Sequence, residues 1–218
     1  MAGLTDVATN YHEVHLTQDP ARAVVWSTVA EYLAPYVPAD SAVLDIGAGY
    51  CDWINFTRAK RRLAVDVWPG IAAHAAPGVE TQVLNLVGGL RSLGTGVFDA
   101  VLASNVLEHF GPGEVDTVVA DVAAVLRPGG RLLAIQPNFR YAWKHYFDDY
   151  THRSVFTHVS LPALLKEHGF RISEVRPKFL PYSMRESRVP IRPWLIRAYL
   201  ASPVKPLAGQ MLVVAEKE

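Results

Sequence analysis

The chain has 218 residues, of which 50% are hydrophobic and 19% are charged. This composition excludes a disordered chain and supplies enough apolar material for one domain over residues 1–218. Basic and acidic residues balance to a net charge of zero, which excludes a general attraction to nucleic acid and leaves any basic surface local.

The first predicted element is a helix, and strands and helices then alternate. Residues 19–36 carry hydrophobic side chains at helical spacing and predict a packing helix within an N-terminal lid, residues 1–38. A second helix is predicted over residues 114–126, where an Arg-Pro-Gly-Gly sequence ends it. Short apolar runs predict strands, buried on both faces, at residues 42–46, 62–66, 79–84, 98–103 and 131–136.

The second half of the chain is less regular. Residues 137–160 are rich in aromatic side chains and histidine, and a helix is predicted from 160 to 168. Two further strands are predicted, at 171–176 and 210–216. The proline- and arginine-rich residues 177–209 between them are interpreted as an irregular insertion before the last strand. Alternation of this kind predicts an α/β fold with a doubly wound, mostly parallel sheet.

The first predicted strand runs into a glycine turn and a helix expected to begin near Cys51. Gly47 and Gly49 remove side chains where the backbone must approach a ligand. Asp52 stands where a dinucleotide fingerprint needs its third glycine, and a carboxylate there would repel a pyrophosphate. S-adenosylmethionine has no phosphate and carries a sulfonium and an ammonium, so acidic residues such as Asp45 favour it over a nicotinamide cofactor.

Polar residues also follow the next three predicted strands. Asp66, at the tip of the second strand, is positioned to accept hydrogen bonds from both ribose hydroxyls. Asn85 follows the third strand and is expected to meet the adenine amine, although it could equally cap a helix. The complete set of expected cofactor contacts is Asp45, Gly47, Ala48, Gly49, Asp66, Val67, Trp68, Asn85, Leu86, Ser104 and Asn105.

These motifs resemble those of class I S-adenosylmethionine-dependent methyltransferases. The resemblance spans about residues 40–175 and is carried by residues 43–52, Asp66, residues 98–110 and residues 126–130. It implies a Rossmann-like, seven-stranded sheet whose last strand is antiparallel. Cys51 and Asn85 depart from the family pattern, which usually has a third glycine and frequently an aspartate at these positions. Residues 19–26, 136–141 and 179–182 further resemble bacterial members associated with glycan or secondary-metabolite pathways.

Methyl transfer to an oxygen requires a positioned acceptor and a base that removes its proton. In the fold that the resemblance implies, the histidine-rich segment after the fifth strand hangs over the cofactor pocket. We predict His152 or His145 as the base, assisted by Asp149, with His109 as the rival. Each histidine also has an ordinary interpretation as a hydrogen-bonded structural residue. The expected acceptor contacts are Tyr146, Arg153 and Arg185.

No metal site is assigned from the sequence. Asp148, Asp149 and His152 offer ligands that suit magnesium, but their spacing matches no defined site. The single cysteine, Cys51, excludes an intrachain disulfide, and the start of the chain lacks the basic and apolar regions of a secretory signal. A cytoplasmic protein with no transmembrane segment is therefore expected.

The predicted function is O-methylation of a small molecule, sugar or glycolipid precursor. N-methylation of a natural product is one alternative, and a non-catalytic subunit that binds S-adenosylmethionine is another. Residues 177–209 leave open peripheral contact with a membrane surface, because basic side chains alternate there with tryptophan, leucine and tyrosine. A homodimer is also left open.

Overall fold

The structure, a computed structural model, describes residues 20–182 and 190–218. A seven-stranded sheet of order β3-β2-β1-β4-β5-β7-β6 forms its centre. Its strands are β1 (Ala42–Ile46), β2 (Arg61–Asp66), β3 (Glu80–Val83), β4 (Phe98–Ser104), β5 (Leu126–Pro137), β6 (Phe170–Pro181) and β7 (Ala208–Lys217). Among these strands β7 runs antiparallel to its two neighbours and the other pairings are parallel. The predicted mostly parallel sheet with an antiparallel last strand is therefore confirmed.

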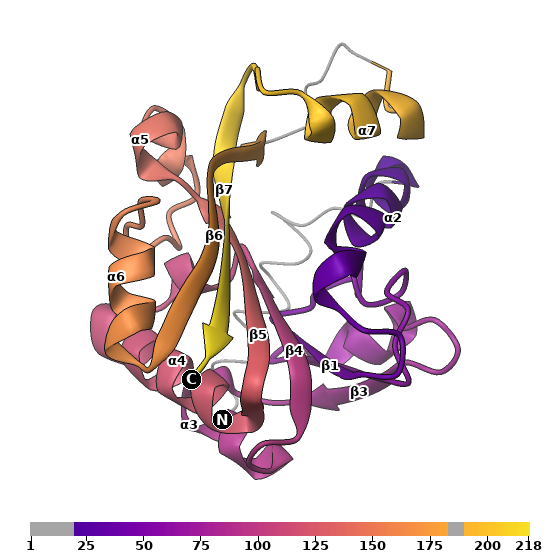
Figure 1. The fold of residues 1–218 in the computed structure, drawn as a ribbon, viewed down its shortest axis with the longest axis vertical. Coiled ribbons are helices and arrows are strands. Elements are labelled where there is room, and N and C mark those ends of the chain that lie inside the picture. The colour runs from indigo at the N-terminus through magenta and orange to yellow at the C-terminus, as the bar shows by residue number, and fades with distance from the viewer. Residues whose placement is uncertain (1–19, 183–189) are drawn as a thin grey trace.

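Helices cover both faces of the sheet (Figure 1). The α-helices are α2 (Pro20–Leu33), α3 (Leu86–Gly89), α4 (Pro112–Val125), α5 (Phe139–Ala142), α6 (Ser160–Glu167) and α7 (Pro193–Ala201). The short 3-10 helices are η1 (Ala34–Tyr36), η2 (Pro69–His74), η3 (Leu90–Leu93), η4 (Leu107–His109) and η5 (Tyr146–Asp148). None of the helices in the described ranges combines the length and apolar character needed to cross a bilayer.

Each face of the sheet has its own hydrophobic core. On one face α4 and α6 pack against the strands, and α4 buries the stripe of valines that its sequence predicted, from Val115 to Val125. On the other face α2 and α7 bury Val25, Val29 and Leu200 against the opposite side chains of the same strands. Alternate residues of β1 and β4 point into different cores, so these central strands are fixed in register by burial on both faces.

The predicted insertion before the last strand is present, but its described residues, 177–182 and 190–209, include regular elements, so the expectation that it is irregular was wrong in part. Strand β6 continues to Pro181, helix α7 follows at Pro193–Ala201, and β7 begins at Ala208. Proline suits the first turn of a helix, where its missing N–H has no partner to lose, so Pro193 begins α7 instead of breaking it. Arg197 of α7 then pairs with Glu31 of α2 at 2.9 Å.

Three further local expectations differ from the structure. No helix begins near Cys51, because residues 51–56 form successive turns before β2. β3 is an exposed edge strand of four residues and is not buried on both faces. The sequence predicted that Ala23, Val29 and Leu33 share the packed face of α2; Val29 and Leu33 are buried, whereas Ala23 is exposed.

Candidate functional site

The glycine turn lies at the carboxyl end of β1, between its parallel neighbours β2 and β4. Gly47 and Gly49 adopt backbone φ angles of +65° and +50°, which residues other than glycine rarely adopt. A Cβ on Gly47 would lie 2.4 Å from Cγ2 of Val106, the second residue after β4. The turn therefore packs directly on the β4 loop, and its backbone at Gly47 has no space for a side chain.

Replacing Gly47 by alanine tests this packing. We expect Gly47→Ala to lower the free energy of unfolding by about 1–3 kcal/mol, through the clash with Val106 and the strained φ. Gly113→Ala is the matched control, since a Cβ there meets nothing within 4 Å and φ is not positive. Urea unfolding of the two variants measures the difference; equal stabilities would contradict the packing argument.

Asp66, at the end of β2, holds the turn in place. Its Oδ2 accepts a hydrogen bond from the backbone N–H of Gly49 at 2.8 Å, and its Oδ1 accepts one from that of Trp68 at 2.9 Å. The side chain is buried. Each carboxylate oxygen has a second lone pair, so both can still accept a ligand hydroxyl, as the predicted ribose contact requires.

Negative charge gathers beneath the glycine turn. Burial and the nearby charges of Asp52 and Asp66 raise the pKa of Asp45 well above its ordinary value. A cation bound beside these carboxylates would offset that repulsion, so the site fits a positively charged ligand. Asp52 is itself paired with Arg22 of α2 at 2.5 Å, which weakens its predicted role in repelling a pyrophosphate.

Three further residues of the expected cofactor set differ in what their side chains contact. Trp68 is half-buried and stacks on His74, with ring centroids 5.3 Å apart. Asn85 is the N-cap of α3, and its Oδ1 accepts a hydrogen bond from the N–H of Val87 at 3.0 Å. Asn85 therefore takes the alternative role considered in the sequence, as the cap of a helix. The side chain of Leu86 is buried in the core, which leaves only its backbone for a ligand contact.

The end of β4 brings the second half of the candidate site to the same edge. Asn105 has a φ of +48°, and its N–H donates to the carbonyl of Ile135 at 2.8 Å. This turn leads into η4, which carries Glu108 and His109. The Glu108 carbonyl accepts hydrogen bonds from the N–H groups of Arg153 at 2.7 Å and Ser154 at 3.1 Å, and so holds the histidine-rich loop against η4.

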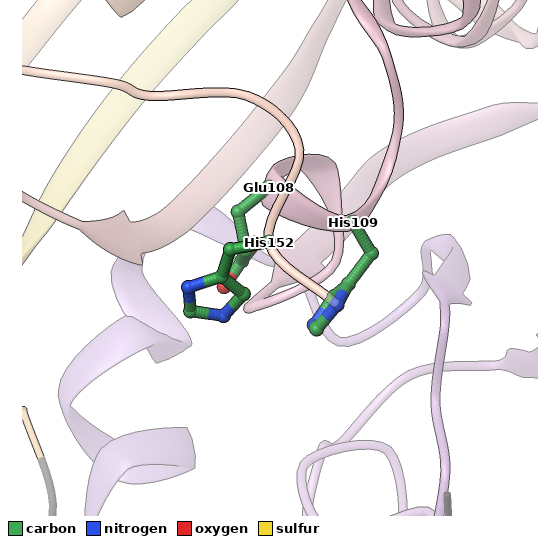
Figure 2. Close-up of side chains that lie close together, drawn as sticks. All are labelled: Glu108, His109 and His152. Atoms are coloured by element: carbon green, nitrogen blue, oxygen red, sulfur yellow. The ribbon is translucent and has the colours of Figure 1, made fainter. Parts of the chain in front are cut away.

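Three side chains from η4 and this loop lie together (Figure 2). The rings of His109 and His152 have centroids 5.0 Å apart. Glu108 lies beside them with 1% of its surface exposed, and the side chain of His152 is 5% exposed. The structure therefore brings His109 and His152 together, from segments about forty residues apart in sequence.

A chain of hydrogen bonds orients His109. Thr151 Oγ1 donates to Asp149 Oδ1 at 2.5 Å, and His109 Nδ1 lies 2.8 Å from the same hydroxyl oxygen. A hydroxyl has one proton, and here it faces a carboxylate, so its oxygen must accept from the imidazole N–H. This arrangement fixes the proton of neutral His109 on Nδ1 and its lone pair on Nε2.

Burial sets the protonation of the cluster. It lowers the pKa of His109 to about 4, with a further contribution from His152, and opposing effects from Asp149 and backbone contacts are smaller. Burial also lowers the pKa of His152. It raises the pKa of Glu108 to about 8. At neutral pH both rings are therefore uncharged and able to accept a proton.

The other predicted acceptor-side residues lie elsewhere. His145 is exposed and pairs with Asp148 at 3.1 Å, so the structure does not bring it to His109 and His152. Tyr146 is fully buried and donates to the Ser154 carbonyl, which leaves its hydroxyl committed within the fold. Arg153 pairs with Glu114 of α4 at 2.6 Å. Arg185 lies outside the described residues.

Sequence reasoning missed Thr151 and gave Glu108 no role. Thr151 stands between Asp149 and His152, so its proximity to that pair is visible in the sequence. Its bond to His109 is not, because it depends on how the loop returns to η4.

Comparison with known proteins gives a consistent family. A family model described as a methyltransferase domain matches residues 20–175. No curated protein matches the sequence. Among solved structures, an S-adenosylmethionine-dependent methyltransferase from Archaeoglobus fulgidus has a TM-score of 0.70 at 18% identity, covering 96% of this chain and 99% of that one.

Two other similar structures contain a cofactor product. One is the 1,6-didemethyltoxoflavin-N1-methyltransferase of Burkholderia thailandensis with its substrate and S-adenosylhomocysteine; its TM-score is 0.59 at 22% identity, covering 98% of this chain and 86% of that one. The other is the N-methyltransferase NodS of Bradyrhizobium japonicum with S-adenosylhomocysteine. Its TM-score is 0.62 at 14% identity, covering 94% of this chain and 91% of that one. At these identities the likeness shows the fold.

Proposed function

Because the chain belongs to the methyltransferase-domain family, we propose that it transfers the methyl group of S-adenosylmethionine to a hydroxyl of a small molecule, sugar or glycolipid precursor. The observation that carries the choice of a hydroxyl is the pair of buried neutral imidazoles, His109 and His152, at the β4 edge. A hydroxyl acceptor needs a base, whereas an amine already has a lone pair to offer.

The cofactor end of the site is built by the glycine turn and Asp66. When bound, S-adenosylmethionine supplies a methyl group that positive sulfur activates toward a nucleophile. Asp66 would accept hydrogen bonds from the ribose, and the backbone at Gly47 and Gly49 would lie against the methionine portion. A bound sulfonium would favour the charged form of Asp45, whose pKa is otherwise raised by burial and by Asp52 and Asp66.

We assign the base to His109 over its neighbour. The Asp149–Thr151 pair orients this ring through Nδ1, and we assign to Nε2 the task of taking a proton from an acceptor hydroxyl. His152, whose side chain is 5% exposed, packs edge-on against the ring. Of the three histidines considered in the sequence, His109 thus combines burial with a ring held by the Thr151 hydroxyl.

The acceptor is proposed to enter between residues 137–160 and 177–209. Both segments line a hollow of about 330 Å³ whose walls include Tyr141, Lys144, Lys178, Tyr182 and Lys205. The Tyr182 hydroxyl donates to the carbonyl of Tyr146 at 3.5 Å, and the ring of Tyr146 packs on His152. Tyr182 and Tyr146 thus connect the wall of this hollow to His152, and the lysines of the hollow suit an acceptor with an anionic part.

Transfer of labelled methyl groups tests the function. The purified chain is incubated with methyl-labelled S-adenosylmethionine and matched pairs of hydroxyl and amine acceptors, with and without a sugar or phosphate group. We expect label in hydroxyl compounds and little in the amines. Transfer confined to amines would establish N-methylation instead, and cofactor binding without transfer to any acceptor would favour the non-catalytic subunit.

A further inference from the structure

The cluster of Glu108, His109 and His152 has the composition of a metal site. One ligand atom from each residue lies within 4.8 Å of those of the other two. The three side chains come from η4 and from the loop after η5, and they converge from opposite sides (Figure 2). Two imidazoles and one carboxylate form a ligand set used by zinc enzymes, with the remaining position open to water or substrate.

Two buried polar atoms of this cluster have no hydrogen-bond partner among residues 20–182 and 190–218. They are Oε2 of Glu108 and Nδ1 of His152. A buried polar atom without a partner destabilises the folded state by about 1–3 kcal/mol. Such atoms are rare in proteins, so two of them in one cluster suggest a function such as binding a ligand. Both belong to residues that the loop's backbone bonds to η4 hold in place, and one ligand atom of each residue lies within 4.8 Å of one from the other.

The third residue of the cluster, His109, has the kind of hydrogen-bond partner that metal-binding histidines usually have. Histidines that bind metals usually donate the other ring N–H to a nearby oxygen, which orients the ring. His109 does this through Nδ1 and the Thr151 hydroxyl, which is bound in turn to Asp149. The ring is thereby held in one orientation beside Glu108 and His152.

We propose that Glu108, His109 and His152 bind one divalent transition-metal ion of the zinc class. Zinc lies about 2.0–2.2 Å from nitrogen and oxygen ligands, so tetrahedral ligand atoms are ~3.4 Å apart. Ligand atoms that lie within 4.8 Å of one another must therefore approach by at most ~1.4 Å. Imidazole ligands favour zinc over magnesium, which prefers oxygen. The magnesium set considered in the sequence is not assembled, because Asp148 is exposed and pairs with His145.

The metal site goes beyond the proposed function and does not depend on it. The cluster without metal offers an imidazole as base, whereas a bound divalent cation lowers the pKa of a coordinated hydroxyl. Either state promotes loss of the acceptor proton. Metal binding can be measured with neither cofactor nor acceptor present, so a failure of methyl transfer would not count against it.

Titration calorimetry with Zn²⁺ tests the site on the full chain after chelator treatment. We expect one ion per chain, and at least tenfold weaker binding in Glu108→Gln and His152→Ala. Glu108→Gln keeps the size of the buried side chain and removes its ability to become a carboxylate. Mg²⁺ is expected to bind at least a hundredfold more weakly than Zn²⁺.

His168→Ala is the control variant, because His168 pairs with Asp116 between α6 and α4, outside the cluster. It should bind Zn²⁺ as the parent does. Thermal melting of the chelator-treated proteins confirms folding, and Zn²⁺ should raise the Tm of the parent and of His168→Ala only. No binding by the parent, or undiminished binding by folded Glu108→Gln and His152→Ala, would overturn the proposal.

Discussion

His109→Asn is expected to lower kcat for a hydroxyl acceptor about 100- to 1,000-fold, the usual contribution of a positioned base. Asparagine can still donate to the Thr151 hydroxyl, but it has no atom that takes a proton at the position of imidazole Nε2. Because His109 lies beyond the glycine turn, the Kd for S-adenosylmethionine should change by less than about threefold. Single-turnover transfer and calorimetry measure the two quantities.

The orienting pair gives this experiment its controls. Thr151→Val removes the hydroxyl that links His109 to Asp149 and should lower kcat about tenfold, whereas Thr151→Ser keeps the hydroxyl and should retain most activity. A structural role alone would not separate valine from serine in kcat while leaving cofactor affinity equal. If His109→Asn keeps more than a tenth of the parent kcat, the base is another group.

The pH profile carries the same assignment. Since the pKa of His109 is lowered to about 4, the ring is unprotonated above about pH 5, and kcat/KM should be level from there toward neutrality. It should fall as the pH drops through about 4. A group with a lowered histidine pKa binds fewer protons folded than unfolded, so stability is also lost between pH 6.5 and about 4. His109→Asn should lose less stability over that interval.

The regular part of the fold was predictable because burial imposes a period on the sequence. β1 has the predicted bounds, and its side chains serve two cores. α7 was missed because its proline and arginines resemble a loop, although Pro193 occupies a helix's first turn. β3 has only four residues and lies at the sheet edge. A strand this short shows no clear alternation of polar and apolar residues, so its exposure was not predicted.

The candidate site was predictable at strand ends and less so in the loop. Gly47, Gly49 and Asp66 meet because parallel strands end at one edge, a consequence of topology. The histidine that lies near this turn is decided by the point at which the Glu108 carbonyl holds the loop. The spacing of residues in the sequence does not reveal that point. The ribose contact is therefore the more secure half of the site to test by substitution.

Asp66→Asn is expected to weaken binding of S-adenosylmethionine about 10- to 100-fold, because a hydrogen bond to a charged group contributes about 1.5–3 kcal/mol. Asparagine keeps the size of the side chain but offers one acceptor oxygen where the carboxylate offers two. The carboxylate already holds the N–H groups of Gly49 and Trp68, so the amide must give up either a turn contact or a ribose hydroxyl.

The form of the loss separates ribose recognition from a charge effect. S-adenosylhomocysteine has the same ribose and no sulfonium charge, so Asp66→Asn should weaken both ligands by the same factor. Glu80→Gln is the control, since Glu80 is an exposed carboxylate paired with Arg61 at the opposite end of these strands. Calorimetry with both ligands decides: unchanged affinity refutes the ribose contact, and a loss limited to S-adenosylmethionine assigns Asp66 to the positive charge alone.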